Sequence, residues 1–194
     1  MRSIEAAEII AVVNKMVVEA NCVLGDDMIR AFAGAQAAEK SPLGREVIAH
    51  LRRNAEIAAA ESLPLCQDTG ISVFFVELGQ DLLIKGGLLA DAIQEGVRRG
   101  DGEGNLRKSM VRNPFDRVNT GDNTPAVIHY DITAGDRLKI TFTAKGGGSE
   151  NMSAVKMLTP ADGAEGMMDF VVAQVKRAGA NPCPPIIRSG AIPR

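Results

Sequence analysis

The chain has 194 residues, of which 45% are hydrophobic, and its charges are interspersed along the sequence with a formal net charge of −2. This composition supports a packed core and excludes a disordered chain, and it offers no basic patch for nucleic acid or an anionic membrane surface. The acidic N-terminal region is unlike a secretory signal, and no apolar run reaches membrane-spanning length. We therefore expect a cytoplasmic protein that binds neither nucleic acid nor membrane.

Three helices are predicted before residue 62. Apolar residues at helical spacing over 3–20 predict the first, with Ser3 as a candidate N-cap. The acidic pair at 26–27 begins a second helix that reaches about Ala37. A third runs from Pro42 to about Ala60 because proline suits the first helical position.

Strand patterns dominate the middle of the chain. An apolar run at 71–78 predicts a buried strand, and a helix is expected at 88–98. Glycine at every second position over 100–105 indicates a flexible surface loop. Segments 126–132 and 137–143 alternate in polarity around a short turn, which is typical of a β-hairpin.

A last amphipathic helix is expected at 164–177. Together these elements predict an α+β fold, with an N-terminal helical group followed by a mainly antiparallel or mixed sheet with packed helices. We expect a single domain over 1–194, helical over 1–62 and α/β over 63–187, with an atypical tail at 188–194.

Four stretches carry unusual side chains. Residues 66–70 read Cys-Gln-Asp-Thr-Gly at a helix-to-strand junction, where Gly70 permits backbone angles that other residues avoid. Residues 119–125 are rich in donors and acceptors, as surface turns often are. Lys145 precedes three glycines, which suit either a flexible loop or an anion cradle. Cys183 lies among three prolines that fix the backbone around a candidate ligand.

These stretches occur in the order and approximate spacing of the iron–sulfur hydro-lyases. To about Ile187, the chain closely resembles the N-terminal (alpha) part of class I fumarase and L-tartrate dehydratase. Each stretch alone is weakly specific, but four in the same order are a strong signal. An odd number of widely spaced cysteines is also consistent with a reducing compartment and metal-binding thiols.

The resemblance implies a 4Fe-4S cluster held by three cysteines, with one iron left open. Thiolates hold such clusters, and an iron with open coordination acts as a Lewis acid. In the family this iron binds the hydroxyl and a carboxylate of a 2-hydroxy dicarboxylic acid, and the expected activity is the hydration of fumarate to malate in the tricarboxylic acid cycle. The positions carried over are the metal ligands Cys66 and Cys183, the catalytic and substrate-binding residues Gln67 and Asp68, and the substrate-binding residues Lys145, Gly146, Gly147 and Gly148.

The chain departs from the family in two ways. The family's third cluster cysteine lies beyond the point where this sequence stops, and Cys22 falls on a predicted helix before any of the four stretches. The tail at 188–194 is also unlike the family, so we expect a C-terminally truncated alpha subunit. The general base is expected in a beta subunit, so the chain should be inactive without that subunit and its own missing part. Expected partners are a small dicarboxylate, the beta subunit and a homo- or hetero-oligomer.

Other readings of the same residues stay open. A non-catalytic paralogue or assembly subunit would explain the missing cysteine, and L-tartrate could replace fumarate as substrate. A zinc or nucleotide site that uses the cysteines with His50 or His129, or the glycine run, is the least favoured, because the ligand spacing fits no compact zinc pattern.

Overall fold

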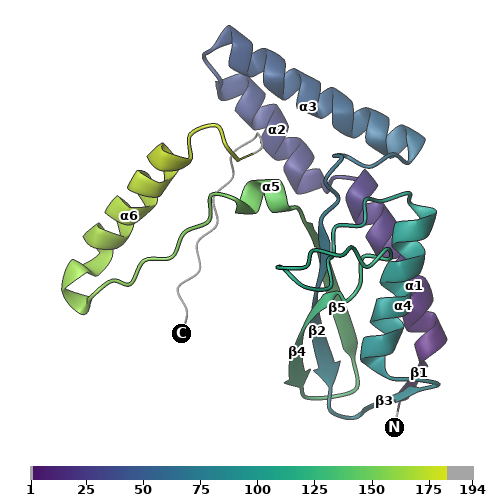
Figure 1. Ribbon diagram of the computed structural model, residues 1–194. Helices are drawn as coiled ribbons and strands as arrows, with labels where there is room; N and C mark the ends of the chain where they lie inside the picture. Colours follow the sequence, from purple (N-terminus) through teal and green to yellow (C-terminus); the bar gives the residue numbers. More distant parts are fainter. Residues whose placement is uncertain (1, 183–194) are drawn as a thin grey trace. The chain divides into compact units, whose positions relative to one another are not determined.

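The computed structural model describes residues 2–182 and divides the chain into two compact units, which meet in sequence between Lys145 and Gly146 (Figure 1). The first unit contains β1 (Arg2–Glu5), α1 (Ala6–Cys22), α2 (Asp26–Ala38), α3 (Pro42–Glu61), β2 (Ile71–Gly79), β3 (Leu82–Lys85), α4 (Leu89–Glu103), β4 (Val127–Thr133) and β5 (Leu138–Lys145). The second contains α5 (Gly147–Glu150), a 3-10 turn (Pro160–Asp162) and α6 (Gly163–Ala178). Helices with a mixed sheet confirm the predicted α+β class. The prediction of a single domain over 1–194 stays a prediction.

The helices at 26–38, 42–61 and 163–178 confirm the sequence patterns. Ser41 caps α3 by accepting a hydrogen bond from the backbone N–H of Gly44 at 3.3 Å. The predicted start of α1 at Ser3 is wrong, because residues 2–5 form strand β1, which pairs in parallel with β3. Glu5 is the N-cap instead, in a capping box with Glu8.

The predicted hairpin between β4 and β5 is also wrong. Both strands pair with β2, which lies in the centre of the order β4-β2-β5, parallel to β4 and antiparallel to β5. The link between β4 and β5 crosses the end of β2, where the N–H of Gly79 donates to the carbonyl of Arg137 at 2.8 Å. A Cβ at Gly79 would lie 2.4 Å from the carbonyl oxygen of Gly135, so the crossing requires glycine. Alternating polarity identified both strands but not their partner.

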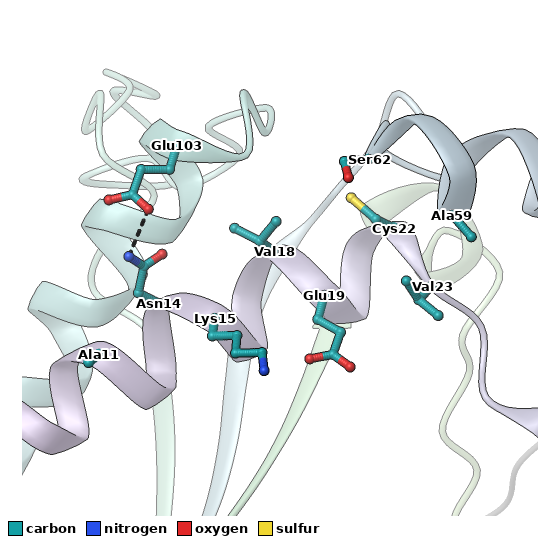
Figure 2. Close-up of a pocket in the computed structure, with 10 residues that line it drawn as sticks. All are labelled: Ala11, Asn14, Lys15, Val18, Glu19, Cys22, Val23, Ala59, Ser62 and Glu103. Atoms are coloured by element: carbon teal, nitrogen blue, oxygen red, sulfur yellow. Dashed lines mark hydrogen bonds between the residues drawn. The ribbon is translucent and has the colours of Figure 1, made fainter.

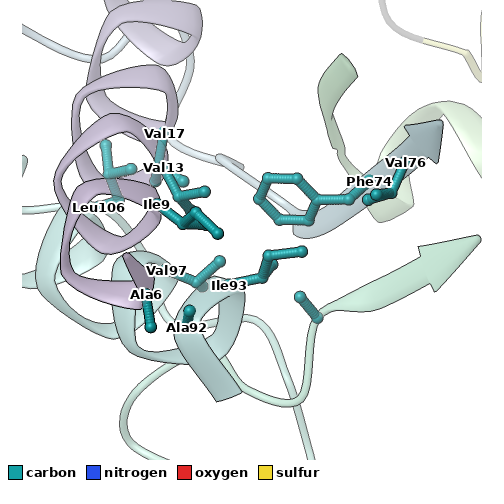
Figure 3. Close-up of a cluster of buried hydrophobic side chains, with 11 residues drawn as sticks. Ala6, Ile9, Val13, Val17, Phe74, Val76, Ala92, Ile93, Val97 and Leu106 are labelled. Carbon is teal, nitrogen blue, oxygen red and sulfur yellow. The ribbon is translucent and has the colours of Figure 1, made fainter. Parts of the chain in front are cut away.

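The core lies between this sheet and the α1–α4 pair (Figure 3). Phe74 of β2 points toward Val13 of α1 and Ile93 of α4, and these side chains are buried in one cluster with Val76. The helix α1 therefore belongs to the layer that covers the sheet, rather than to a group of three N-terminal helices.

The predicted flexible loop at 100–105 is wrong, because α4 continues to Glu103 and its last turns are packed. A Cβ at Gly96 would lie 2.6 Å from Cβ of Val13, and one at Gly100 would lie 2.8 Å from Cβ of Val17. Two glycines four residues apart thus let the α1 and α4 backbones approach closely. Of the glycines that suggested a loop, Gly100 serves this helix packing.

Candidate functional site at one end of the three-stranded sheet

The sheet order brings three of the four polar stretches to one end of the sheet. Ile71 begins β2, and its register partner in the antiparallel strand β5 is Lys145, the last residue of that strand. Strand β4 runs parallel to β2, and Val127 near its start pairs with Val73. Residues 66–70, residues 119–125 and Lys145 therefore meet at this end. The strand pairing thus brings together stretches that lie far apart in the sequence.

The backbone on the N-terminal side of Cys66 is held by two helices. The N–H of Leu65 donates to the carbonyl of Asn21 at the end of α1, at 2.8 Å. Its carbonyl accepts a hydrogen bond from the side-chain amide of Asn54 on α3, also at 2.8 Å. Cys66 is exposed, and its thiol donates to Oε1 of Gln67 at 3.3 Å. The result is an accessible thiol on a backbone that is fixed immediately before it.

The C-terminal side of this segment is held by residues 107 and 123. The hydroxyl of Thr69 accepts from the N–H of Arg107 at 2.9 Å and donates to its carbonyl at 3.1 Å. Gly70 has φ +74, which confirms the predicted need for glycine, and its carbonyl accepts from the side-chain amide of Asn123 at 3.0 Å. Asp68 is half-buried between these anchored residues.

Arg107 was missed in the sequence analysis. Its side chain is exposed, and its backbone is tied to Thr69, three residues from Cys66. A guanidinium on a backbone anchored to this segment suits the binding of a carboxylate ligand. No local pattern singles out Arg107, which follows a glycine-rich segment without a recognisable motif. Only the hydrogen bonds to Thr69 bring its backbone to this end of the sheet.

The stretch at 119–125 is more than a surface turn, because Asn123 is buried and connects three segments. Its Oδ1 accepts from the backbone N–H groups of Ser109 and Met110 at 3.0 and 3.1 Å. Its Nδ2 donates to Gly70, as described above. Asn119 adds a second tie to the segment before it, from Nδ2 to the carbonyl of Lys108 at 2.8 Å. These amides tie the loop to residues 108–110, and Asn123 also ties it to the Cys66 segment.

One face of α4 holds the same loop from the other side. Gln94 accepts from the N–H of Ala126 at 2.7 Å, and one turn later Arg98 donates to Asp122 at 3.1 Å. Burial acts to raise the pKa of Asp122, but hydrogen bonds from Thr124 and from Arg98 outweigh it and lower the pKa to about 2. The loop is therefore anchored by an ionised carboxylate on this side.

Asp101 comes two turns after Gln94 on α4 and is 1% exposed. Burial raises the pKa of Asp101 to about 6, although the Asn123 amide and the Lys108 ammonium both favour its charged form. Neither carboxylate oxygen has a hydrogen-bond partner among the described residues. Gln94 and Arg98 on this face of α4 bond to the loop, whereas the carboxylate of Asp101 has no hydrogen bond to the described part of the chain.

Lys145 ends the first unit, and the glycine run begins the second. Gly146 is an extended N-cap with φ −71 and ψ 150, and Gly147 begins the single turn of α5. A Cβ at Gly147 would meet no atom within 4 Å. This geometry does not decide between a flexible loop and an anion cradle. The substrate-binding role of Lys145, Gly146, Gly147 and Gly148 stays a prediction.

The other two cysteines differ from Cys66. Cys22 is buried at the end of α1, and burial raises the pKa of its thiol. It lines an open groove of about 530 Å³ along α1, with Lys15, Val18 and Ser62 (Figure 2). Cys183 lies outside the described residues. Within residues 2–182, no group of three or more His, Cys, Asp or Glu side chains is arranged to hold a metal ion.

Two further observations concern the predicted zinc alternative and the predicted lack of membrane segments. His129, one of the candidates for a zinc site, stacks on Phe75 of the neighbouring strand with ring centroids 5.0 Å apart. Over the part of the chain that the structure describes, no helix has the length and apolar character needed to cross a membrane.

Comparison with known proteins places this architecture in a family. The family described as Fumarate hydratase (Fumerase) matches residues 10–192. A protein of Methanocaldococcus jannaschii, provisionally named L(+)-tartrate dehydratase subunit alpha, is 36% identical over 87% of this chain and 61% of its own length. The L(+)-tartrate dehydratase subunit alpha of Escherichia coli strain UTI89 is 31% identical over 84% of this chain and 54% of its own length. The chain thus spans between half and two thirds of the relatives it matches. These matches confirm the resemblance drawn from the four polar stretches: the chain belongs to the class I fumarate hydratase and L(+)-tartrate dehydratase alpha-subunit family.

Proposed function

We propose that this chain is the alpha-type part of a hydro-lyase that acts on a 2-hydroxy dicarboxylate. The observation that carries the proposal is the pairing of Ile71 with Lys145, which brings Lys145 to the end of the sheet where the Cys66–Gly70 segment enters β2. A thiol, an amide, a carboxylate and a cation at one place suit a metal-assisted elimination on an acidic substrate.

The features of Cys66 suit a ligand of a 4Fe-4S cluster. Its thiol is exposed, and the Leu65 backbone before it is held from both sides by Asn21 and Asn54. Cys183 is the second expected ligand, and a third is expected outside this chain. Cys22 is a poor ligand because burial raises its pKa and disfavours the thiolate. A bound cluster would supply a Lewis acid for the departing hydroxyl group.

The chain's own residues would bind and orient the substrate. Gln67 and Asp68 follow the ligand cysteine directly, and their backbone is anchored at Thr69 and Gly70. A residue fixed in this way keeps its side chain oriented without reorganisation during the reaction. Arg107 and Lys145 would attract the two carboxylates of the substrate, and the Gly146–Gly148 backbone is proposed to cradle one of them.

The identity of the substrate is a separate part of the proposal. The matched relatives are named as L(+)-tartrate dehydratase alpha subunits, which favours L(+)-tartrate, whereas the family description names fumarate hydratase and keeps the fumarate–malate pair as the second candidate. A beta-subunit partner is proposed because the relatives are named alpha subunits.

The decisive measurement is iron and sulfide content after anaerobic reconstitution, with and without the beta subunit. We expect close to four of each per chain with the partner present, a large loss in Cys66→Ser, and no loss in the matched control Cys22→Ser. The reconstituted complex should then release water from L(+)-tartrate or hydrate fumarate, which a direct comparison of the two substrates decides. A chain that retains no iron in either condition would favour the non-catalytic alternative.

A further inference from the structure

Strand β4 forms one edge of the three-stranded sheet (Figure 1). It pairs with β2 on one side, and within residues 2–182 no strand pairs with its other side. Edge strands can pair with another chain, and proteins usually protect them with lysine, proline or a bulge. The opposite edge strand, β5, carries Lys139 and Lys145, whereas β4 reads Val-Ile-His-Tyr-Asp-Ile-Thr and contains neither lysine nor proline. The free edge of β4 is therefore open to pairing along its 7 residues.

The alternation of the backbone identifies the groups that point outward from this edge. The carbonyl of Thr133, the last residue of β4, accepts a hydrogen bond from the N–H of Gln80, which directly follows β2, at 2.9 Å. The backbone groups of Thr133 therefore face β2. Alternate residues of a strand direct their N–H and C=O groups to opposite edges, so those of Ile128, Tyr130 and Ile132 point away from β2. These three residues offer both donors and acceptors to a further strand.

The sequence of β4 is complementary to itself in antiparallel order. When two copies pair about a two-fold axis at Tyr130, Ile128 of each copy lies opposite Ile132 of the other. His129 of each copy then lies opposite Asp131 of the other, in the pairs whose side chains approach most closely. An imidazole can donate a hydrogen bond to a carboxylate whether it is neutral or protonated. The central residues of β4 therefore each meet a suitable residue in a second copy.

The exposure of the β4 side chains agrees with this pairing. Tyr130 is the register partner of the buried Val76, so it lies on the face of the sheet that the helices cover. Ile128 and Ile132 share this face because side chains alternate along a strand. Tyr130 is nevertheless 46% exposed and Ile132 is 76% exposed. A second β4 beside them would continue the apolar layer past the present edge.

We propose that β4 is a self-association strand, which pairs antiparallel with β4 of a second copy and joins the two sheets into one. Antiparallel pairing places the two candidate sites at opposite ends of the joined sheet, so neither copy covers the site of the other. The inference goes beyond the proposed function and requires neither a cluster nor a beta subunit. Pairing through one short strand buries less surface than a standard interface, so we expect a dissociation constant of about 10–100 µM.

A charge-exchange experiment on the iron-free chain tests the predicted register. In His129→Glu a carboxylate lies opposite Asp131 of the other copy, and the two-fold axis repeats this repulsion. Sedimentation equilibrium should show a dissociation constant at least about tenfold higher than that of the wild type. Asp131→Lys supplies an ammonium opposite the new carboxylate. A mixture of the two variants should therefore form dimers with an affinity within about threefold of the wild-type value.

Two controls carry the same substitutions elsewhere. His50→Glu changes an exposed histidine of α3, and Asp136→Lys changes an exposed aspartate beyond the end of β4. Neither should alter the dissociation constant. A wild-type chain that stays monomeric up to about 500 µM would overturn the proposal. A mixture of the β4 variants that associates no better than His129→Glu alone would overturn it too, because a fault within one copy cannot be repaired by a second copy.

Hydrogen exchange in the wild-type chain covers the case in which a β4 variant does not fold. The amides of Ile128, Tyr130 and Ile132 should be at least about tenfold better protected well above the dissociation constant than well below it. Protection that does not change with concentration would overturn the proposal and would indicate a cover supplied by the same chain. Neither measurement needs iron, so its failure is distinct from a failure to bind a cluster.

Discussion

The hydroxyl of Thr69 both accepts from the backbone N–H of Arg107, at 2.9 Å, and donates to its carbonyl, at 3.1 Å. Thr69 is 7% exposed, so water does not readily replace either bond. One side chain thus satisfies both backbone groups of a residue 38 positions away and fixes the Arg107 backbone next to Thr69, which lies three residues after Cys66.

Replacing this hydroxyl should destabilise the fold. Thr69→Val keeps the shape but leaves two backbone groups of Arg107 unpaired, which costs about 2–3 kcal/mol. The matched control, Thr69→Ser, keeps the hydroxyl and should cost less than about 1 kcal/mol. Urea unfolding followed by circular dichroism measures both, and equal losses in the two variants would contradict the role given to the hydroxyl.

Two glycines on α4, one that packs against α1 and one that does not, allow a matched test of the packing between these helices. In Gly100→Ala the new methyl group would lie 2.8 Å from Cβ of Val17, and we expect a loss of about 1–3 kcal/mol in unfolding free energy. In Gly102→Ala the methyl group meets nothing within 4 Å, so helix propensity should add up to about 1 kcal/mol. Opposite signs in thermal or urea unfolding are expected. Equal effects would argue that the α1–α4 contact is looser than described.

The raised pKa of Asp101 makes stability depend on pH. Burial raises the pKa from 3.8 to about 6, so between these values the folded chain binds more protons than the unfolded chain. The free energy of unfolding should therefore fall as pH rises from 4 to 6, by about 3 kcal/mol, and this loss should be complete above that range. Asp101→Asn should lack this component, and the difference between the two unfolding curves across pH measures it. A wild-type curve parallel to that of the variant would contradict the assignment.

The cysteines should differ in their reactivity toward alkylating reagents. Cys66 is exposed, whereas Cys22 is buried with a raised pKa, so we expect Cys66 to react at least about tenfold faster. Mass spectrometry of peptides after timed labelling separates the two sites. Equal rates would mean that the end of α1 opens readily. Cys66→Ser should abolish the fast phase assigned to that residue and leave labelling of Cys22 unchanged.

Local patterns predicted most elements but not their partners. Helical spacing and the Ser41–Pro42 pair identified α3 correctly, because the capping signal and the apolar period are both local. Alternation identified β4 and β5, yet their pairing with β2 depends on residues about 50 or more positions away. Gly100 looked like part of a loop because its contact with α1 does not appear in its own stretch of sequence.

For the candidate site, the sequence by itself determined the chemistry: a cysteine followed by an amide and a carboxylate, a lysine before three glycines, and the family to which these belong. Only the tertiary structure decided that Lys145 pairs beside Ile71, that Thr69 holds Arg107, and that Asn123 joins Gly70 to residues 109–110. The physical reason is that residue types specify which groups can bind or react. Their meeting depends on strand order and on long-range hydrogen bonds, for which no short segment of sequence carries a signal.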